Sequence, residues 1–154
     1  MSGAFVELNI DDQEVKDLLD RLSQRMGNLT PVMKEIGEIV TESVQRNFEE
    51  HKSPEGVAWT PLADSTKAFK EKKGRKAEDI LIMSTILMKS IHPEAHEDNV
   101  EVGTDIVYAA IHQFGGDAGR GHKVKILARP FLGVRESDWP EIENMLMDEL
   151  FSNI

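Results

Sequence analysis

Apolar residues recur every three or four positions in three stretches of the chain, and this spacing predicts three amphipathic helices. The first expected helix starts at a capping box, Asp11 to Glu14, in which carboxylate side chains accept hydrogen bonds from helix N–H groups. It ends at Gly27, because glycine tolerates the positive φ of a helix terminus. Its apolar face comprises Val15, Leu18, Leu19, Leu22 and Met26.

The second expected helix is the longest, and it opens at Thr30-Pro31, where the missing N–H of proline costs nothing. It extends to Glu49, and its apolar stripe comprises Val32, Ile36, Ile39, Val40, Val44 and Phe48. A third helix opens at a second capping box, Asp138 to Glu141. Its stripe comprises Trp139, Ile142, Leu146 and Leu150, with Met145 as a further candidate. Because these stripes have to be buried, we expect the second helix to pack against a sheet.

Alternating apolar and polar residues predict three strands, at 5–10, 99–104 and 122–128. Between the last two strands, residues 106–114 indicate a short helix closed by Gly115 and Gly116. Residues 117–122 are rich in glycine and are expected to form a loop.

Two further segments lie between the long helix and the second strand. Residues 63–73 indicate a short, mostly polar helix that ends at Gly74. Residues 80–91 are apolar, and their spacing fits a helix or a strand equally well. This apolar segment is expected to end at His92-Pro93, because the residue before a proline disfavours helix.

Strands separated by helices favour an α+β fold, with a small, mostly antiparallel sheet packed against the long helix and a helix at the C-terminus. At 154 residues the chain is expected to form one domain, residues 1–154. The sequence contains no cysteine, which excludes disulfides, thiolate zinc sites and cysteine nucleophiles. It shows neither a signal peptide nor a long apolar run, so we expect a protein of the cytoplasm without membrane contact.

The formal net charge is −10, which makes the whole molecule a poor general binder of nucleic acid. Charge is unevenly distributed, however. Residues 67–76 hold six basic residues and one acid, a net of +5, whereas residues 136–154 carry six acids and no base. Such a split is usual for solvated helix faces, but it would also allow copies of the chain to stack head to tail.

No constellation of residues predicts catalysis or a cofactor. His92 and His96 have the spacing of metal ligands on a helix, but Pro93 lies between them and would break that helix. A catalytic role for His112 would pair it with Ser84, Ser90 or a carboxylate, and no serine of the chain lies in a nucleophile elbow. The glycine-rich segment 115–121 lacks the Gly-Lys-Ser/Thr ending of a phosphate loop. We therefore expect no metal, no cofactor and no enzymatic activity.

Three short segments, called punctuated blocks because glycine or proline interrupts regular structure there, each place an aromatic residue beside glycine or proline. They are residues 54–62, 108–116 and 128–133. Glycine and proline fix turns, and aromatic side chains pin such turns to a core. The blocks predict structural anchors at Trp59, Tyr108, His112, Phe114, Arg129 and Phe131.

These blocks, in this order, resemble the phage virion morphogenesis family, the tail-completion proteins of Mu-like and related contractile-tailed phages. The resemblance covers residues 46–134. It includes Arg46-Asn47-Phe48, the basic segment, Leu87 to Ile91, and Val102-Gly103-Thr104 between the punctuated blocks. It implies a structural virion protein that acts in tail completion and head–tail joining, at the neck or tail terminus. Related neck proteins form rings, commonly six-fold.

The resemblance further implies several partners: copies of the chain in a ring, a hexamer in the common arrangement, and other neck and tail proteins of the phage. Genomic DNA would pass through the lumen without sequence-specific binding, and an acidic ring would not retain it. The protein would be assembled in the host cytoplasm and reside in the virion. Candidate contact residues lie in polar segments: Lys67, Lys70, Lys72, Lys73, Gly116, Asp117 and Arg120.

Two interpretations from other classes stay open at this point. One is a small assembly-associated enzyme with His112 as general base, which would require a pocket and a perturbed partner around that residue. The other is a nucleic-acid-binding module that uses Lys67–Lys76, which would require DNA affinity that falls steeply with salt.

Overall fold

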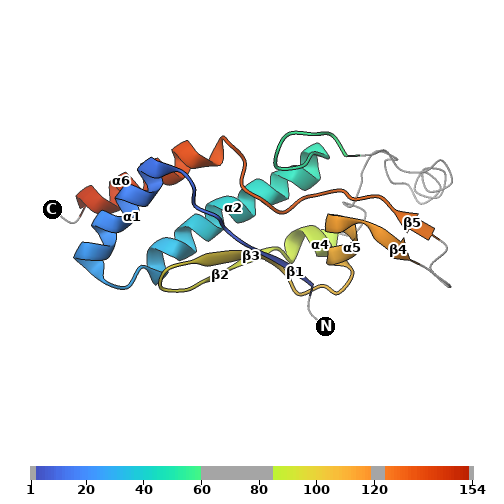
Figure 1. The fold of residues 1–154 in the computed structure, drawn as a ribbon, viewed down its shortest axis with the longest axis horizontal. Coiled ribbons are helices and arrows are strands. Elements are labelled where there is room, and N and C mark those ends of the chain that lie inside the picture. Colours follow the sequence, from blue (N-terminus) through green and yellow to red (C-terminus); the bar gives the residue numbers. More distant parts are fainter. Residues whose placement is uncertain (1–2, 60–84, 119–123, 153–154) are drawn as a thin grey trace.

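The computed structural model describes residues 3–59, 85–118 and 124–152. A 21-residue helix, α2 (Thr30–Glu50), runs through the middle of the elongated molecule (Figure 1). The other elements, in chain order, are β1 (Ala4–Glu7), α1 (Gln13–Met26), α4 (Thr85–Lys89), β2 (His92–Ala95), β3 (Val100–Thr104), α5 (Ala109–Phe114), β4 (Gly116–Ala118), β5 (Val124–Ile126) and α6 (Asp138–Ser152). The predicted α+β class is therefore confirmed.

Three of the strands form an antiparallel sheet in the order β1-β3-β2. In this register Val6 pairs with Val102, and Pro93 pairs with Val102 from the other side. The apolar segment ends before His92-Pro93 as predicted, because α4 stops at Lys89, but the strand β2 that begins at His92 was not predicted. A proline lacks the N–H that a central strand needs, but β2 lies at the edge of this sheet, where proline is tolerated.

The long helix packs against this sheet, as its apolar stripe predicted, and contacts β2 and β3. Gly37 lies at the point of closest approach. A Cβ on Gly37 would stand 2.5 Å from Cβ of Pro93 and 2.8 Å from a methyl group of Val100. The absence of a side chain at this position therefore lets helix and sheet approach closely.

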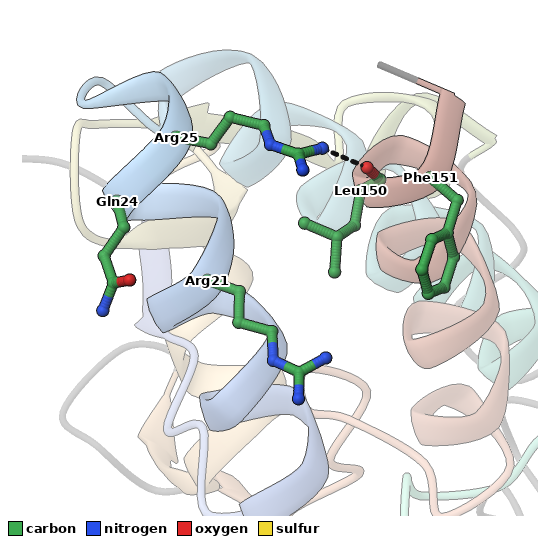
Figure 2. Close-up of a pocket in the computed structure, with 5 residues that line it drawn as sticks. All are labelled: Arg21, Gln24, Arg25, Leu150 and Phe151. Carbon is green, nitrogen blue, oxygen red and sulfur yellow. Dashed lines mark hydrogen bonds between the residues drawn. The ribbon is translucent and has the colours of Figure 1, made fainter. Parts of the chain in front are cut away.

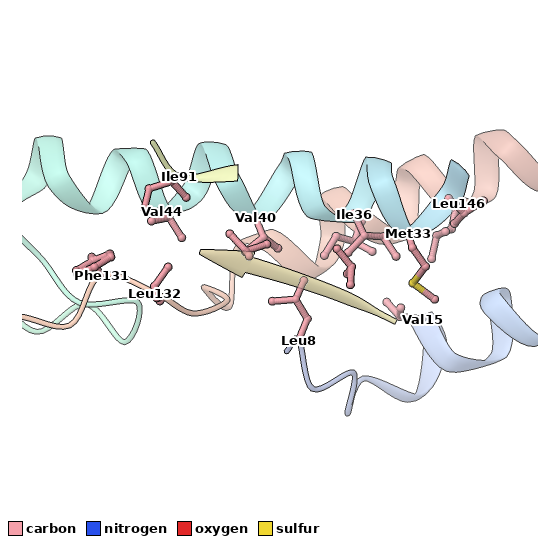
Figure 3. Packing of buried hydrophobic residues seen from close by; sticks show 14 of the residues in the cluster. Leu8, Val15, Met33, Ile36, Val40, Val44, Ile91, Phe131, Leu132 and Leu146 are labelled. Carbon is pink, nitrogen blue, oxygen red and sulfur yellow. The ribbon is translucent and has the colours of Figure 1, made fainter. Parts of the chain in front are cut away.

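The helices α1 and α6 lie side by side at one end of the molecule, and α6 also packs on α2 (Figure 1). Their buried side chains join one hydrophobic cluster with those of α2. Figure 3 shows Val15 of α1, Met33 and Ile36 of α2, and Leu146 of α6 in this cluster. The predicted stripes are confirmed with one exception: Met26, at the end of α1, is exposed.

Both predicted capping boxes need correction. The N-cap of α1 is Asp12 and not Asp11, because Asp12 Oδ1 accepts the hydrogen bond from the Val15 N–H at 3.0 Å. Asp138 is the first helical residue of α6, and its Oδ2 accepts a hydrogen bond from the N–H of Arg135 at 2.8 Å. Asp138 thus fixes the chain that enters α6 and does not cap the helix in the expected way.

The segment after α5 differs most from expectation. Residues Gly116–Ala118 form strand β4, which pairs with β5 in a separate two-stranded antiparallel sheet. The sequence predicted a loop for residues 117–122. It did not predict that the strand expected at 122–128 pairs with a strand at 116–118. Glycine and aspartate disfavour strands, so local sequence gave no signal for β4. The helix α4 shows that residues 85–89, in the ambiguous apolar segment, are helical. The helix predicted for residues 63–73 lies outside the described residues.

Candidate functional site

Two loops meet at the C-terminal end of α2, and aromatic rings hold them there. Trp59 comes from the loop after α2, and Phe131 comes from the segment between β5 and α6. Both are almost fully buried against Phe48 of α2. The ring centroids lie 5.7 Å apart for Phe48 and Trp59, and 4.9 Å apart for Phe48 and Phe131. These are the separations of favourable aromatic pairs.

Hydrogen bonds to the backbone of residues 130–132 fix the same place, which we call the loop junction: the contact of the loop after α2 and the segment between β5 and α6 with the end of α2. The indole N–H of Trp59 donates to the carbonyl oxygen of Pro130 at 2.7 Å. Oε1 of Gln113, on α5, accepts hydrogen bonds from the N–H groups of Phe131 and Leu132, both at 3.0 Å. This stretch belongs to no strand or helix, so side chains satisfy backbone groups that secondary structure would otherwise pair.

A polar network continues the junction toward α6. Asn47 is fully buried, and its Nδ2 donates to the carbonyl oxygen of Phe131 at 2.9 Å. Its Oδ1 accepts from Nε of Arg135 at 2.7 Å, and Arg135 also pairs with Glu50 at 2.8 Å. The buried carboxylate of Asp138 lies 3.8 Å from the guanidinium of Arg46. One end of α2 therefore binds the whole segment that leads into α6.

The loop after α2 is a tight turn. The N–H of Ser53 donates to the carbonyl oxygen of Val57 at 2.8 Å, and the N–H of Trp59 donates to that of His51 at 2.8 Å. Gly133 packs against this loop with φ 153°, and a Cβ there would stand 2.8 Å from Cγ of Pro54. A glycine at position 133 therefore satisfies both an unusual backbone angle and a close contact.

The structure separates the predicted anchors into two groups. Trp59 and Phe131 are buried, with 5% and 0% of their surface exposed. Tyr108 and Phe114 are 45% and 71% exposed, so the prediction that they are buried in the core is wrong. The helix α5 has six residues and fully buries only Ala109, so an aromatic residue at its end has no core to enter. Their exposure instead makes them candidates for contact with a partner.

His112 lies half-buried at the base of the β4–β5 sheet. Its ring stands edge-on to Tyr108, with centroids 6.0 Å apart, and its carbonyl oxygen accepts from the N–H of Arg129 at 2.8 Å. Burial, and then the charge of Arg129, lower the pKa of His112 below its usual range. Burial also lowers the pKa of Arg129. Among the described residues, Nδ1 of His112 has no hydrogen-bond partner.

This arrangement gives the enzyme interpretation little support. The hydroxyl of Ser90 is engaged with the carbonyl oxygen of Leu87 and with the hydroxyl of Thr104, at 2.7 and 2.6 Å. Within the described ranges no group of histidine and acidic residues has the arrangement of a metal site. Ser84, the other candidate nucleophile, lies outside the described residues.

Several predicted contact residues also lie outside the described residues: Lys67, Lys70, Lys72, Lys73 and Arg120. Gly116 and Asp117 belong to β4, so they are not in a loop as predicted. No helix in the described part of the chain is long and apolar enough to cross a membrane.

Sequence reasoning missed Asn47, Gln113 and Arg135. Asn47 carried a usable signal, because a polar residue within the apolar stripe of a long helix is buried and needs a partner. Gln113 and Arg135 carried none, since their partners lie 18 and 88 residues away in the sequence.

Comparison with known proteins identifies the class to which this fold and loop junction belong. The model of the phage virion morphogenesis family matches residues 10–151, and the chain belongs to that family. It is 38% identical over 145 residues to the Mu-like prophage FluMu G protein 2 of Haemophilus influenzae, with 94% of this chain and 95% of that protein covered. No solved structure matches the chain.

Two relatives from Escherichia phages are more distant. Tail completion protein S of phage P2 is 28% identical over 148 residues, which cover 89% of this chain and 97% of that protein. Putative capsid assembly protein G of phage Mu is 30% identical over 102 residues, 65% of each chain. The predicted family resemblance is therefore confirmed.

Proposed function

We propose that this chain is a structural, non-enzymatic protein of a tailed phage or prophage. In this proposal it completes the tail at its head-proximal end, so that filled heads can join. The observation that carries the proposal is similarity along nearly the whole chain to a protein named for tail completion. The loop junction supports a structural role, because its polar side chains satisfy backbone groups and do not converge on a reactive centre.

The subunit acts as one member of a ring around the DNA channel. Its surface charge supports this arrangement. Five of the six acids in residues 136–154 are at least partly exposed, and only Asp138 is buried. Glu143 lies so close to Glu14 and Asp12 that these carboxylates raise its pKa. An acidic surface of this kind repels DNA and would let it pass.

The exposed side chains near the β4–β5 sheet supply a surface for other neck and tail proteins. Phe114 immediately precedes Gly115 and β4, and Leu127 immediately follows β5; both are largely exposed, at 71% and 48%. Figure 1 shows this small sheet at the end of the molecule away from α1 and α6. Apolar side chains that flank a projecting sheet fit a contact with a neighbouring protein.

The proposal is tested by deleting the gene from the phage or prophage that encodes this chain. We expect DNA-filled heads and separate tails to accumulate, and electron microscopy of the lysate distinguishes the two. The intact gene supplied in trans should restore joined particles. Normal joined particles from the deletion strain would contradict the proposal, and so would the absence of this chain from purified virions.

A further inference from the structure

A groove lies between the C-terminal ends of α1 and α6, at the end of the molecule opposite the β4–β5 sheet (Figure 1). Its volume is about 480 Å³, and it is lined by Arg21, Gln24, Arg25, Leu150 and Phe151. Figure 2 shows Arg21 and Arg25 reaching from α1 toward α6, with the Leu150 side chain between the two helices. Phe151 is 53% exposed and forms part of the α6 side of the groove.

The two arginines differ in what they bind. Arg25 donates a hydrogen bond to the carbonyl oxygen of Leu150, which satisfies an unpaired group at the end of α6. Among the described residues, Arg21 has no hydrogen-bond or ion-pair partner. A guanidinium beside an apolar wall binds a carboxylate that has an apolar side chain next to it. The chemistry of the groove therefore suits an acidic, partly apolar segment.

The chain itself presents such a segment in the turn between β3 and α5. The side chain of Asp105 is 76% exposed, and Val107 and Tyr108 are 65% and 45% exposed. Hydrogen bonds fix the turn: the N–H of Ala109 donates to the carbonyl oxygen of Ile106 at 3.1 Å. The N–H of Ile106 donates to the hydroxyl of Thr104, also at 3.1 Å. A turn held in this way loses little entropy when it binds.

We propose that the Asp105–Tyr108 turn of one copy docks into the α1–α6 groove of the next copy. The carboxylate of Asp105 pairs with the guanidinium of Arg21, and Val107 and Tyr108 cover Leu150 and Phe151. Among the described residues, the ion pair of Asp105 is with the partly exposed His92, at 3.9 Å, and a pair of this kind contributes little. Turn and groove are different surfaces, so the contact is heterologous and closes into a ring when the rotation permits. This inference rests on the proposed ring.

Cross-linking tests the contact directly, and a chain without cysteine makes the test clean. Gln24, in the groove, and Val107, in the turn, are exposed, so Gln24→Cys and Val107→Cys should both preserve the fold. Phage particles that carry both changes on one chain are treated with a short bis-maleimide. We expect a ladder of covalent multimers of this chain. Each single-cysteine chain should give no ladder beyond a dimer.

The outcomes separate this inference from the proposed function. If the chain is present in joined particles but gives no ladder, the inference is overturned and the proposed function stands. Cross-linking of the groove cysteine to a different virion protein overturns the assignment of a second copy as the occupant. Absence of the chain from the particles overturns both.

Charge reversal provides a second measurement. Arg21→Glu and Asp105→Arg should each reduce the yield of infectious particles, and the two changes together should restore it. Lys16→Glu, the same charge change elsewhere on the exposed face of α1, should leave the yield unchanged. Unfolding curves of the purified variants verify that each is folded. A double variant no better than the single ones, or Arg21→Glu with the yield of the native chain, overturns the inference.

Discussion

The side-chain amide of Asn47 donates a hydrogen bond to the carbonyl oxygen of Phe131, which lies 84 residues further along the chain. Asn47 is fully buried, and its amide oxygen accepts a second hydrogen bond, from Arg135. A single helical residue therefore fixes two points of the segment between β5 and α6. This contact stabilises the joined loops together with the aromatic rings beside it.

We predict that Asn47→Ala lowers the free energy of unfolding by about 1–3 kcal/mol, because a buried carbonyl group loses its donor. Glu49→Ala, two residues away on the exposed side of the same helix, serves as the control and should have little effect. Thermal or urea unfolding of the two variants measures the difference. Equal stability of both variants would show that the network around Asn47 contributes nothing.

A second prediction tests whether the side-chain oxygen of Gln113, which accepts two hydrogen bonds, is what stabilises the fold. Gln113→Leu leaves the N–H groups of Phe131 and Leu132 without their acceptor, and we expect a loss of about 1–3 kcal/mol. Gln113→Glu keeps an oxygen at the same place and should retain more of the stability at neutral pH. Urea unfolding compares the two variants. Greater damage from glutamate than from leucine would mean that the acceptor does not matter.

The helices were predictable because their apolar periodicity is long and strong, and each apolar stripe required a partner surface. The strand β2 was not, because Pro93 argues against a strand unless the strand lies at an edge, and edge position is a property of the whole sheet. The exposure of Tyr108 and Phe114 was missed for a related reason. Aromatic residues beside glycine indicate a fixed turn, but whether the ring faces the core or solvent depends on elements far away in the sequence.

A third prediction concerns the contact of α2 with the sheet. Gly37→Ala improves helix propensity by about 1 kcal/mol. The new methyl group would meet Pro93 at 2.5 Å, and overpacking of this kind costs about 1–3 kcal/mol. We therefore expect net destabilisation in thermal unfolding, whereas Lys34→Ala on the exposed side of the same helix should be neutral or slightly stabilising. A Gly37→Ala variant more stable than the native chain would show that the sheet moves away without cost.

A fourth prediction follows from the lowered pKa of His112. Below its ordinary value of 6.5 the unfolded chain binds a proton that the folded chain does not yet bind. The contribution of His112 to stability is therefore complete above pH 6.5 and falls as the pH decreases toward the lower pKa of the folded state. His112→Gln removes this contribution. Between pH 8 and pH 5.5 the native chain should lose more stability in urea unfolding than the variant does, and parallel pH curves would contradict the prediction.

The last prediction contrasts two aromatic residues that the sequence treated alike. Trp59 is 5% exposed and packs on Phe48, so Trp59→Ala should cost about 3–5 kcal/mol, the usual loss for a buried aromatic side chain. A domain of this size has about 5–15 kcal/mol of stability, so the melting temperature should fall clearly. Phe114 is 71% exposed, and Phe114→Ser should change stability by less than about 0.5 kcal/mol.

In the phage the two substitutions should act through different quantities: the amount of folded protein for Trp59→Ala, and the yield of joined particles for Phe114→Ser. Trp59→Ala should reduce the amount of folded protein, which a Western blot of the lysate measures. Phe114→Ser should leave that amount unchanged but lower the yield of joined particles, because an exposed apolar ring beside β4 is suited to contact a neighbouring protein. A Phe114→Ser phage with normal yield would remove this surface from the proposed contacts. A large loss of stability in purified Phe114→Ser would instead return Phe114 to a structural role.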